Sequence, residues 1–142
     1  MTVRSARLAV ALPVILAACA TNYDPPDSVL PLPSKPGKSV LRTEPVTVSA
    51  FLAGTAGSLA ELNTAECQLV RGGQSVRFTT PMTVGVPLYE GPAQKMTVTC
   101  SAVLGPRTRK TAVEIEPEVV EVDANPSSKR IYPASVSVRF SQ

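Results

Sequence analysis

Cysteine is the residue type whose number and positions suggest specific chemistry in this sequence. The chain of 142 residues contains Cys19, Cys67 and Cys100 and has no histidine. The commonest general base and metal ligand of proteins is therefore missing, and no histidine can activate a cysteine as a nucleophile. We expect the cysteines to be modified or paired, and we predict no catalytic residue, no metal site and no cofactor.

Other catalytic patterns are weak. The sequence has no Gly-x-Ser-x-Gly motif and no phosphate-binding glycine loop. A Ser–Lys pair or a carboxylate pair could work without histidine, but Glu114, Glu116 and Glu118 alternate along one expected strand face, as solvated side chains do. Glu121 and Asp123 extend this acidity, and a weak calcium site there is the alternative. We predict that the protein is not an enzyme and has no small-molecule substrate.

A short basic cluster is the best candidate for contact with a partner. Arg107, Arg109 and Lys110 follow an expected turn at Gly105-Pro106. Three positive charges in one loop could meet an acidic polymer or lipid head groups. A solvated loop without a partner is the alternative.

The first residues have the pattern of a secretory signal. Arg4 and Arg7 precede an apolar run at residues 8–16, and two small residues follow it. The run is much shorter than the about 20 residues that a membrane-spanning helix needs. The pattern predicts a signal peptide at residues 1–18.

The segment Leu16-Ala17-Ala18-Cys19 resembles the lipobox of bacterial lipoproteins at all four positions. The resemblance implies cleavage between Ala18 and Cys19, diacylglycerol on the Cys19 thiol and usually a further acyl chain on the new amine. Several acyl chains hold a protein at a membrane far more firmly than one. Ala20 stands where an Asp would suggest retention in the inner membrane, so the family pattern implies the outer membrane. We expect the domain on its periplasmic face. An ordinary secretory signal with an incidental Cys19 is the alternative.

The mature chain would be nearly neutral. Residues 1–18 carry two of the 14 basic side chains and none of the 11 acidic ones, so 12 basic and 11 acidic side chains remain, a net charge of +1. The chain has three Tyr, three Phe and no Trp. Nucleic-acid-binding proteins show a basic stripe or a set of stacking aromatic residues, so we expect no nucleic-acid partner.

Cys67 and Cys100 remain as a pair if Cys19 carries lipid. Export would place them in a compartment that permits disulfides. Both positions also lie on strand faces that the alternating pattern predicts to be buried. We predict a structural disulfide between them; two free thiols or a redox role are the alternatives.

Two further regions follow the signal. Residues 19–45 are predicted to be a proline-rich tether, because prolines interrupt every helical or strand pattern and favour extended chain; they are Pro25, Pro26, Pro31, Pro33, Pro36 and Pro45. Residues 46–142 are predicted to be one domain. Apolar and polar residues alternate in most of its segments, which is typical of strands.

About seven short strands are expected in this domain, with turns at 71–74, 90–92, 105–107 and 125–128 and one possible helical turn at 58–62. No segment has a sustained helical period. The pattern predicts an all-β fold, a single antiparallel β-sandwich of immunoglobulin-like or related type.

The segment from Ala65-Glu66-Cys67 to Thr97-Val98-Thr99-Cys100, with Thr80-Pro81-Met82-Thr83-Val84 between, resembles PEGA-type or carboxypeptidase-regulatory-like sandwich modules of envelope proteins. This resemblance also implies a sandwich fold.

These features favour a non-enzymatic, lipid-anchored adaptor or structural protein of the outer membrane. Its expected partners are the membrane, through the acyl chains, and an envelope protein or peptidoglycan. The alternative is an inhibitor of host hydrolases such as lysozyme, which would insert a loop at residues 87–93 or 105–110 into an active site.

Overall fold

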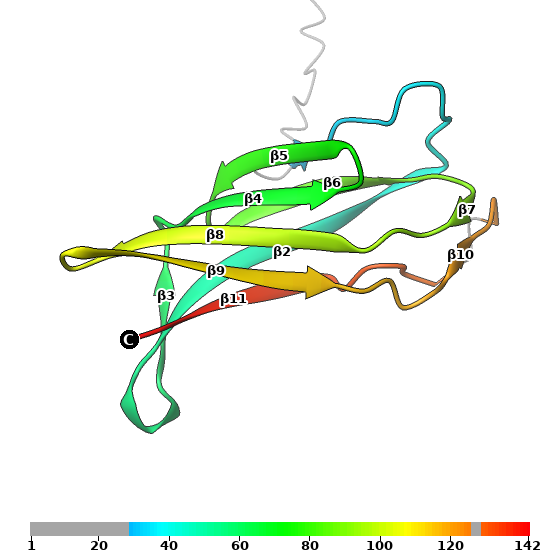
Figure 1. Ribbon diagram of the computed structural model, residues 1–142. Coiled ribbons are helices and arrows are strands. Elements are labelled where there is room, and N and C mark those ends of the chain that lie inside the picture. Colours follow the sequence, from blue (N-terminus) through cyan, green and yellow to red (C-terminus); the bar gives the residue numbers. More distant parts are fainter. Residues whose placement is uncertain (1–28, 126–128) are drawn as a thin grey trace, which may run out of the picture.

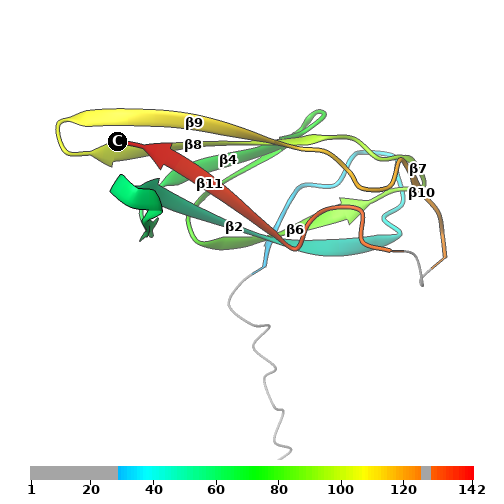
Figure 2. The same ribbon diagram turned by 90° about the horizontal axis from the view of Figure 1, so that it is seen from below.

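The computed structural model describes residues 29–125 and 129–142, which form a β-sandwich without any α-helix. Sheet one has the strand order β1-β6-β2-β11, with β3 also paired with β2, and sheet two has the order β5-β4-β8-β9. The short strands β7 and β10 form a ribbon at one end of the sandwich, and the β8–β9 hairpin and the C-terminus lie at the other end (Figures 1 and 2). The predicted all-β sandwich is confirmed.

Eight of the described strands have four residues or more. The bounds are β1 Leu30–Pro31, β2 Arg42–Ala53, β3 Leu59–Leu62, β4 Glu66–Arg71, β5 Gln74–Thr79, β6 Met82–Leu88, β7 Gly91–Pro92, β8 Met96–Leu104, β9 Arg107–Ile115, β10 Glu121–Val122 and β11 Ser135–Ser141. A short 3₁₀ turn, η1, spans Thr55–Gly57.

Sheet one is built around β2. Its alternating residues Val46, Val48 and Ala50 are completely buried, which is what period-two patterning produces in a half-buried strand. β6 and β3 pair with it in antiparallel orientation, whereas β11 runs parallel to it. The pairing of β1 with β6 is also parallel. The sandwich is therefore antiparallel apart from these two pairings.

Sheet two consists of two hairpins side by side. β4 and β5 turn at Gly72, where φ is +58°, and β8 and β9 turn at Gly105, where φ is +62°. Glycine reaches these left-handed conformations without the steric cost that a Cβ would bring. The turns predicted at 71–74 and 105–107 are confirmed.

The predicted boundary between tether and domain, at residues 45 and 46, is wrong. Leu30–Pro31 already pairs with β6, Leu32 is 2 % exposed in the core, and β2 starts at Arg42. Prolines are tolerated here because β1 is an edge strand and because β11 covers β2 only from Thr47 onward. The predicted signal peptide, and the tether up to residue 28, lie outside the described residues.

The helical turn expected at 58–62 is also wrong, because strand β3 occupies most of that segment. β3 pairs with Ala50–Ala53 of β2, beyond the part of β2 that β6 covers. Residues 59–62 have no clear strand pattern of their own, and they form a strand because they pair with this otherwise unpaired edge of β2. The one short helix in the described chain, η1, precedes it.

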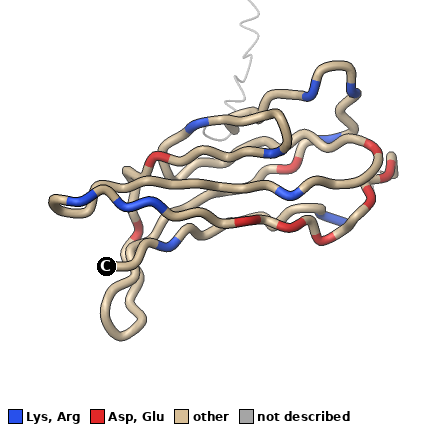
Figure 3. Tube along the Cα trace, in the orientation of Figure 1, with Lys and Arg blue, Asp and Glu red and all other residues tan. Residues whose placement is uncertain are grey.

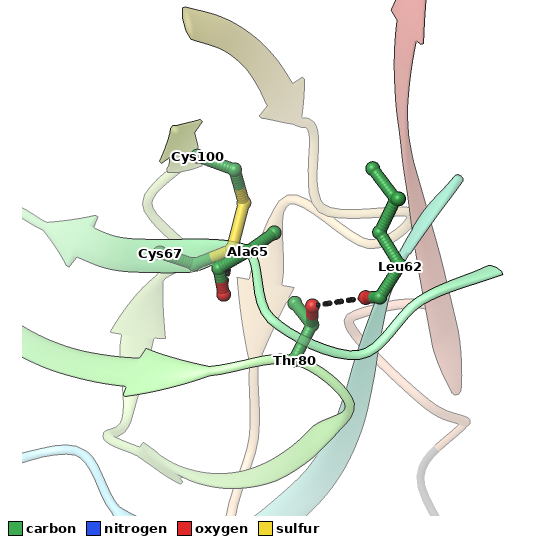
Figure 4. Close-up of a disulfide and its surroundings, with 5 residues drawn as sticks. All are labelled: Leu62, Ala65, Cys67, Thr80 and Cys100. Atoms are coloured by element: carbon green, nitrogen blue, oxygen red, sulfur yellow. Dashed lines mark hydrogen bonds between the residues drawn. A yellow bond between two sulfur atoms is a disulfide. The ribbon is translucent and has the colours of Figure 1, made fainter. Parts of the chain in front are cut away.

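The chain crosses between the sheets twice at nearly the same place, after β3 and after β5. Buried Thr80, which follows β5, donates its Oγ1 hydrogen to the Leu62 carbonyl at 2.7 Å and its backbone N–H to the Ala65 carbonyl at 2.9 Å. Figure 4 shows this contact beside the disulfide. The two crossings are therefore tied to each other.

The predicted disulfide between Cys67 and Cys100 is present. The two residues lie directly opposite each other on β4 and β8, with their Cα atoms 4.1 Å apart and their side chains in the core. The bond therefore joins neighbouring strands of one sheet, whereas the disulfide of an immunoglobulin domain joins the two sheets.

Glu44 fixes the segment that leads into β11. This side chain of β2 is buried, and its carboxylate accepts the backbone N–H groups of Ile131 and Tyr132 at 3.0–3.2 Å. Arg42 lies 3.6 Å from the same carboxylate and also donates to the Lys129 carbonyl. A buried carboxylate is tolerated here because backbone donors replace its hydration.

We predict that Cys67→Ala/Cys100→Ala lowers the free energy of unfolding by about 3.5–4 kcal/mol. The bond spans 33 residues, and a loop of that length restricts the unfolded chain by about that amount. Urea unfolding of the double variant against the oxidised parent measures it. An unchanged midpoint would contradict the estimate.

We predict that Glu44→Ala destabilises the domain by about 3 kcal/mol, because it leaves buried backbone donors without a partner. The matched control is Glu61→Ala, which removes an exposed carboxylate from β3 and should change stability by less than about 0.5 kcal/mol. Thermal unfolding followed by circular dichroism compares the two. Equal losses of stability in the two variants would show that the contacts of Glu44 do not stabilise the domain.

Candidate functional site

The predicted lipidation site, Ala18 and Cys19, lies outside the described residues. Among residues 29–125 and 129–142, no helix is long and apolar enough to cross a membrane. No cluster of three or more potential metal-ligating side chains occurs in those residues either.

The structure separates the predicted basic cluster of Arg107, Arg109 and Lys110. Successive side chains of a strand point to opposite faces, so β9 places Lys110 on the outer face of sheet two, opposite Ser101. Arg107 and Arg109 lie on the other face and line a small hollow of about 190 Å³ near the C-terminus. Figure 3 shows basic residues along this hairpin and acidic residues near the end of β9 and around β10.

The acidic residues do not share one strand face. Glu114 lies in β9 and forms an exposed salt bridge with Lys95 at 3.3 Å. β9 ends at Ile115, so Glu116 and Glu118 lie in the following loop. All three carboxylates are exposed, as the solvated interpretation predicted.

The outer face of sheet two contains a depression of about 540 Å³, which we call the sheet-two hollow. Three charged side chains line it, Glu66 from β4, Arg77 from β5 and Lys110 from β9. All three are exposed, and none forms a salt bridge within the described part of the chain. Hydroxyl and amide groups stand between them, from Gln68, Thr79, Thr99 and Ser101.

The register of the strands explains why these residues gather. Glu66 is paired with Thr79 on one side and with Ser101 on the other, and Ser101 is paired with Lys110. Paired residues point to the same face. Cys67 and Cys100 form part of the floor of the hollow, so the disulfide holds together the strands beneath it.

A second site surrounds Arg71 at the end of β4. This side chain is only 4 % exposed, its Nη1 donates to the Pro87 carbonyl at 2.6 Å, and its guanidinium lies 5.3 Å from the centre of the Tyr89 ring. Its Nη2 is buried and makes no hydrogen bond with the described residues. No carboxylate of the described chain forms a salt bridge with it.

Arg71 lines a cavity of about 70 Å³, which we call the Arg71 pocket. Its lining includes Lys35, Lys38, Glu90 and Gln94. The sequence interpretation placed Arg71 in a turn and missed the pocket. The alternation of buried and exposed residues in β4 could have predicted the burial of Arg71. Arg71 lies two residues after Leu69 and four after Cys67, on the same buried face of the strand.

Tyr132 lines the same pocket. Its hydroxyl donates to the Gln94 carbonyl. Burial raises the pKa of the Tyr132 phenol above its ordinary value of 10.0, and the nearby Arg71 guanidinium opposes part of that shift. The phenol is thus held in its neutral, donating form.

No protein-family model, curated protein or solved structure matches this chain.

We predict that the stability of the domain falls as the pH rises above about 10 and that Tyr132→Phe removes part of this fall. A raised pKa in the folded state means that folding favours the neutral phenol, so its contribution is complete below pH 10 and is lost as the folded-state pKa is passed. Below that pH the variant should be less stable by about 1 kcal/mol, for the lost hydrogen bond. Unfolding curves of the parent and the variant at several pH values measure both effects. If the free energy of unfolding falls equally with pH in the two proteins, Tyr132 is not the group responsible.

Proposed function

We propose that this chain is a non-enzymatic lipoprotein of the bacterial outer membrane whose β-sandwich binds an envelope component through the sheet-two hollow. The observation that carries the proposal is the set of charged side chains in this hollow, Glu66, Arg77 and Lys110, which have no partner within the described chain. The lipobox at residues 16–19 supplies the anchor, with acyl chains on Cys19 and the domain on the periplasmic side.

The chemistry of the hollow favours a polar partner. Both signs of charge are present, and hydroxyl and amide groups lie between them. A peptide surface or peptidoglycan, which carries hydroxyl, carboxylate and amine groups, can pair with such a surface. Complementary charges steer encounter and fix register, as they do in other interfaces.

A rigid scaffold supports this use of the face. The hollow lies across regular strands, and the Cys67–Cys100 bond links the two strands in its middle. Little ordering is then needed on binding, which preserves affinity. A PEGA-type or carboxypeptidase-regulatory-like module, the resemblance seen in the sequence, would fit the same role.

The test is photo-crosslinking in cells from two positions. A photo-reactive residue at Thr99 stands in the hollow, and one at Ser137 stands on exposed β11 as the control. We predict one dominant adduct from Thr99 only, and its loss when Cys19→Ala removes the anchor. Mass spectrometry identifies the adduct as a protein or as peptidoglycan fragments.

A charge reversal sharpens the assignment. Lys110→Glu should reduce the Thr99 adduct about tenfold, a change of ~1.4 kcal/mol, whereas Arg139→Glu on β11 should leave it unchanged. The absence of any adduct from Thr99 would contradict the proposal. Inhibition of lysozyme by the purified protein in that case would favour the hydrolase-inhibitor alternative.

A further inference from the structure

Arg71 is an incompletely satisfied buried cation. Its Nη1 donates to the Pro87 carbonyl and its face lies over Tyr89, but Nη2 makes no hydrogen bond with the described residues, although the Tyr132 hydroxyl is close to the guanidinium. A buried charge without an ionic partner costs several kcal/mol in most proteins. Unlike Glu44, whose carboxylate accepts backbone N–H groups and lies near Arg42, Arg71 keeps an unused donor, and the residue lines a cavity.

The surroundings of this donor are positive. Of the charged side chains that line the Arg71 pocket, three are cations, Arg71, Lys35 and Lys38, and one is a carboxylate, Glu90. Both lysines are exposed, so their ammonium groups can reach a ligand at the mouth of the pocket. The amides of Gln74 and Gln94 add neutral donors to the lining.

The loop that carries the lysines is fixed to the same site. The backbone N–H of Lys35 donates to the Tyr89 hydroxyl at 2.6 Å, and the N–H of Leu41 donates to the Leu88 carbonyl at 2.8 Å. Tyr89 therefore contacts the buried guanidinium with its ring and holds the lysine loop with its hydroxyl. The two lysines and Arg71 converge although 33 residues or more separate them in sequence.

We infer that the Arg71 pocket binds a phosphate group. The cavity of about 70 Å³ has room for several water molecules or for one small oxyanion. A carboxylate would leave more of the positive charge uncompensated, whereas the dianionic form of a phosphate matches an excess of two cations. A guanidinium donor with lysine point charges is also a common arrangement for phosphate recognition in proteins.

Two sources can supply this group, free phosphate and the head group of an anionic lipid. The lipid source rests on the proposed function, because lipid-linked Cys19 would keep the domain near a membrane, and the lysine loop is close in sequence to that anchor. Binding of free phosphate does not depend on the anchor.

The experiment uses the isotope-labelled mature chain from residue 19 onward with Cys19→Ala, which contains every described residue. Inorganic phosphate is titrated at constant ionic strength, with chloride as the matched anion. We expect saturable shifts of the Arg71 guanidinium signals and of the amides of Lys35, Gly37 and Lys38, and none with chloride. Shifts without saturation, or shifts confined to other residues, overturn the inference.

Variants locate the site. Lys35→Ala/Lys38→Ala keeps the backbone bond to Tyr89 and should weaken phosphate binding at least about tenfold, because each lost ion contact is charge-assisted. The control, Lys129→Ala/Arg139→Ala, also removes two exposed cations, which line neither the Arg71 pocket nor the sheet-two hollow, and should bind like the parent. Arg71→Gln should abolish binding, but the lysine variant decides the question if this one fails to fold. Equal affinity of the lysine variant and its control overturns the assignment.

A second arm separates the sources. Co-sedimentation with phosphatidylcholine vesicles, with and without phosphatidic acid, is compared for the parent and the lysine variant. Binding that requires both phosphatidic acid and the lysines identifies a lipid head group. Phosphate binding without vesicle binding retains the site and assigns it to free phosphate, and this result leaves the sheet-two hollow and its proposed partner untouched.

Discussion

The sandwich depends on the place where the chain crosses twice between its sheets. Thr80 ties the two crossings by donating to the carbonyls of Leu62 and Ala65. The Cys67–Cys100 bond lies next to this contact and fixes β4 against β8 (Figure 4). Many of the core side chains are small, mainly Val and Ala, so apolar burial per residue is modest. The Thr80 contacts therefore tie the two crossings between the sheets, and the disulfide beside them holds two strands of sheet two together.

Buried charges add a second kind of constraint. Glu44 and Arg71 are both almost inaccessible to solvent, yet they differ in how their charges are satisfied. Glu44 binds backbone N–H groups and locks the segment before β11. Arg71 uses one donor for the Pro87 carbonyl and leaves another without a hydrogen bond among the described residues, and the residue lines a cavity. The first arrangement is complete within the domain, whereas the second leaves a donor without a hydrogen bond among the described residues, which is the basis of the inferred phosphate site.

The two candidate surfaces are independent of each other. The sheet-two hollow lies on the outer face of regular strands and has both signs of charge, which suits an extended polar partner. The Arg71 pocket is small, lies where loops meet and has an excess of positive charge, which suits a single oxyanion. A protein held at a membrane could use both at once, the pocket for a head group and the hollow for a component of the envelope.

The sequence by itself determined the fold class, the disulfide and the turns at 71–74 and 105–107, because alternation of apolar residues and glycine positions are local signals. It did not determine where the domain starts, because Leu30–Pro31 becomes a strand only through pairing with β6. It grouped Arg109 with Lys110, which the two faces of β9 separate. Only the tertiary structure brought Lys35 to Arg71. Contacts between distant segments depend on register and packing, and a local pattern contains no information about either.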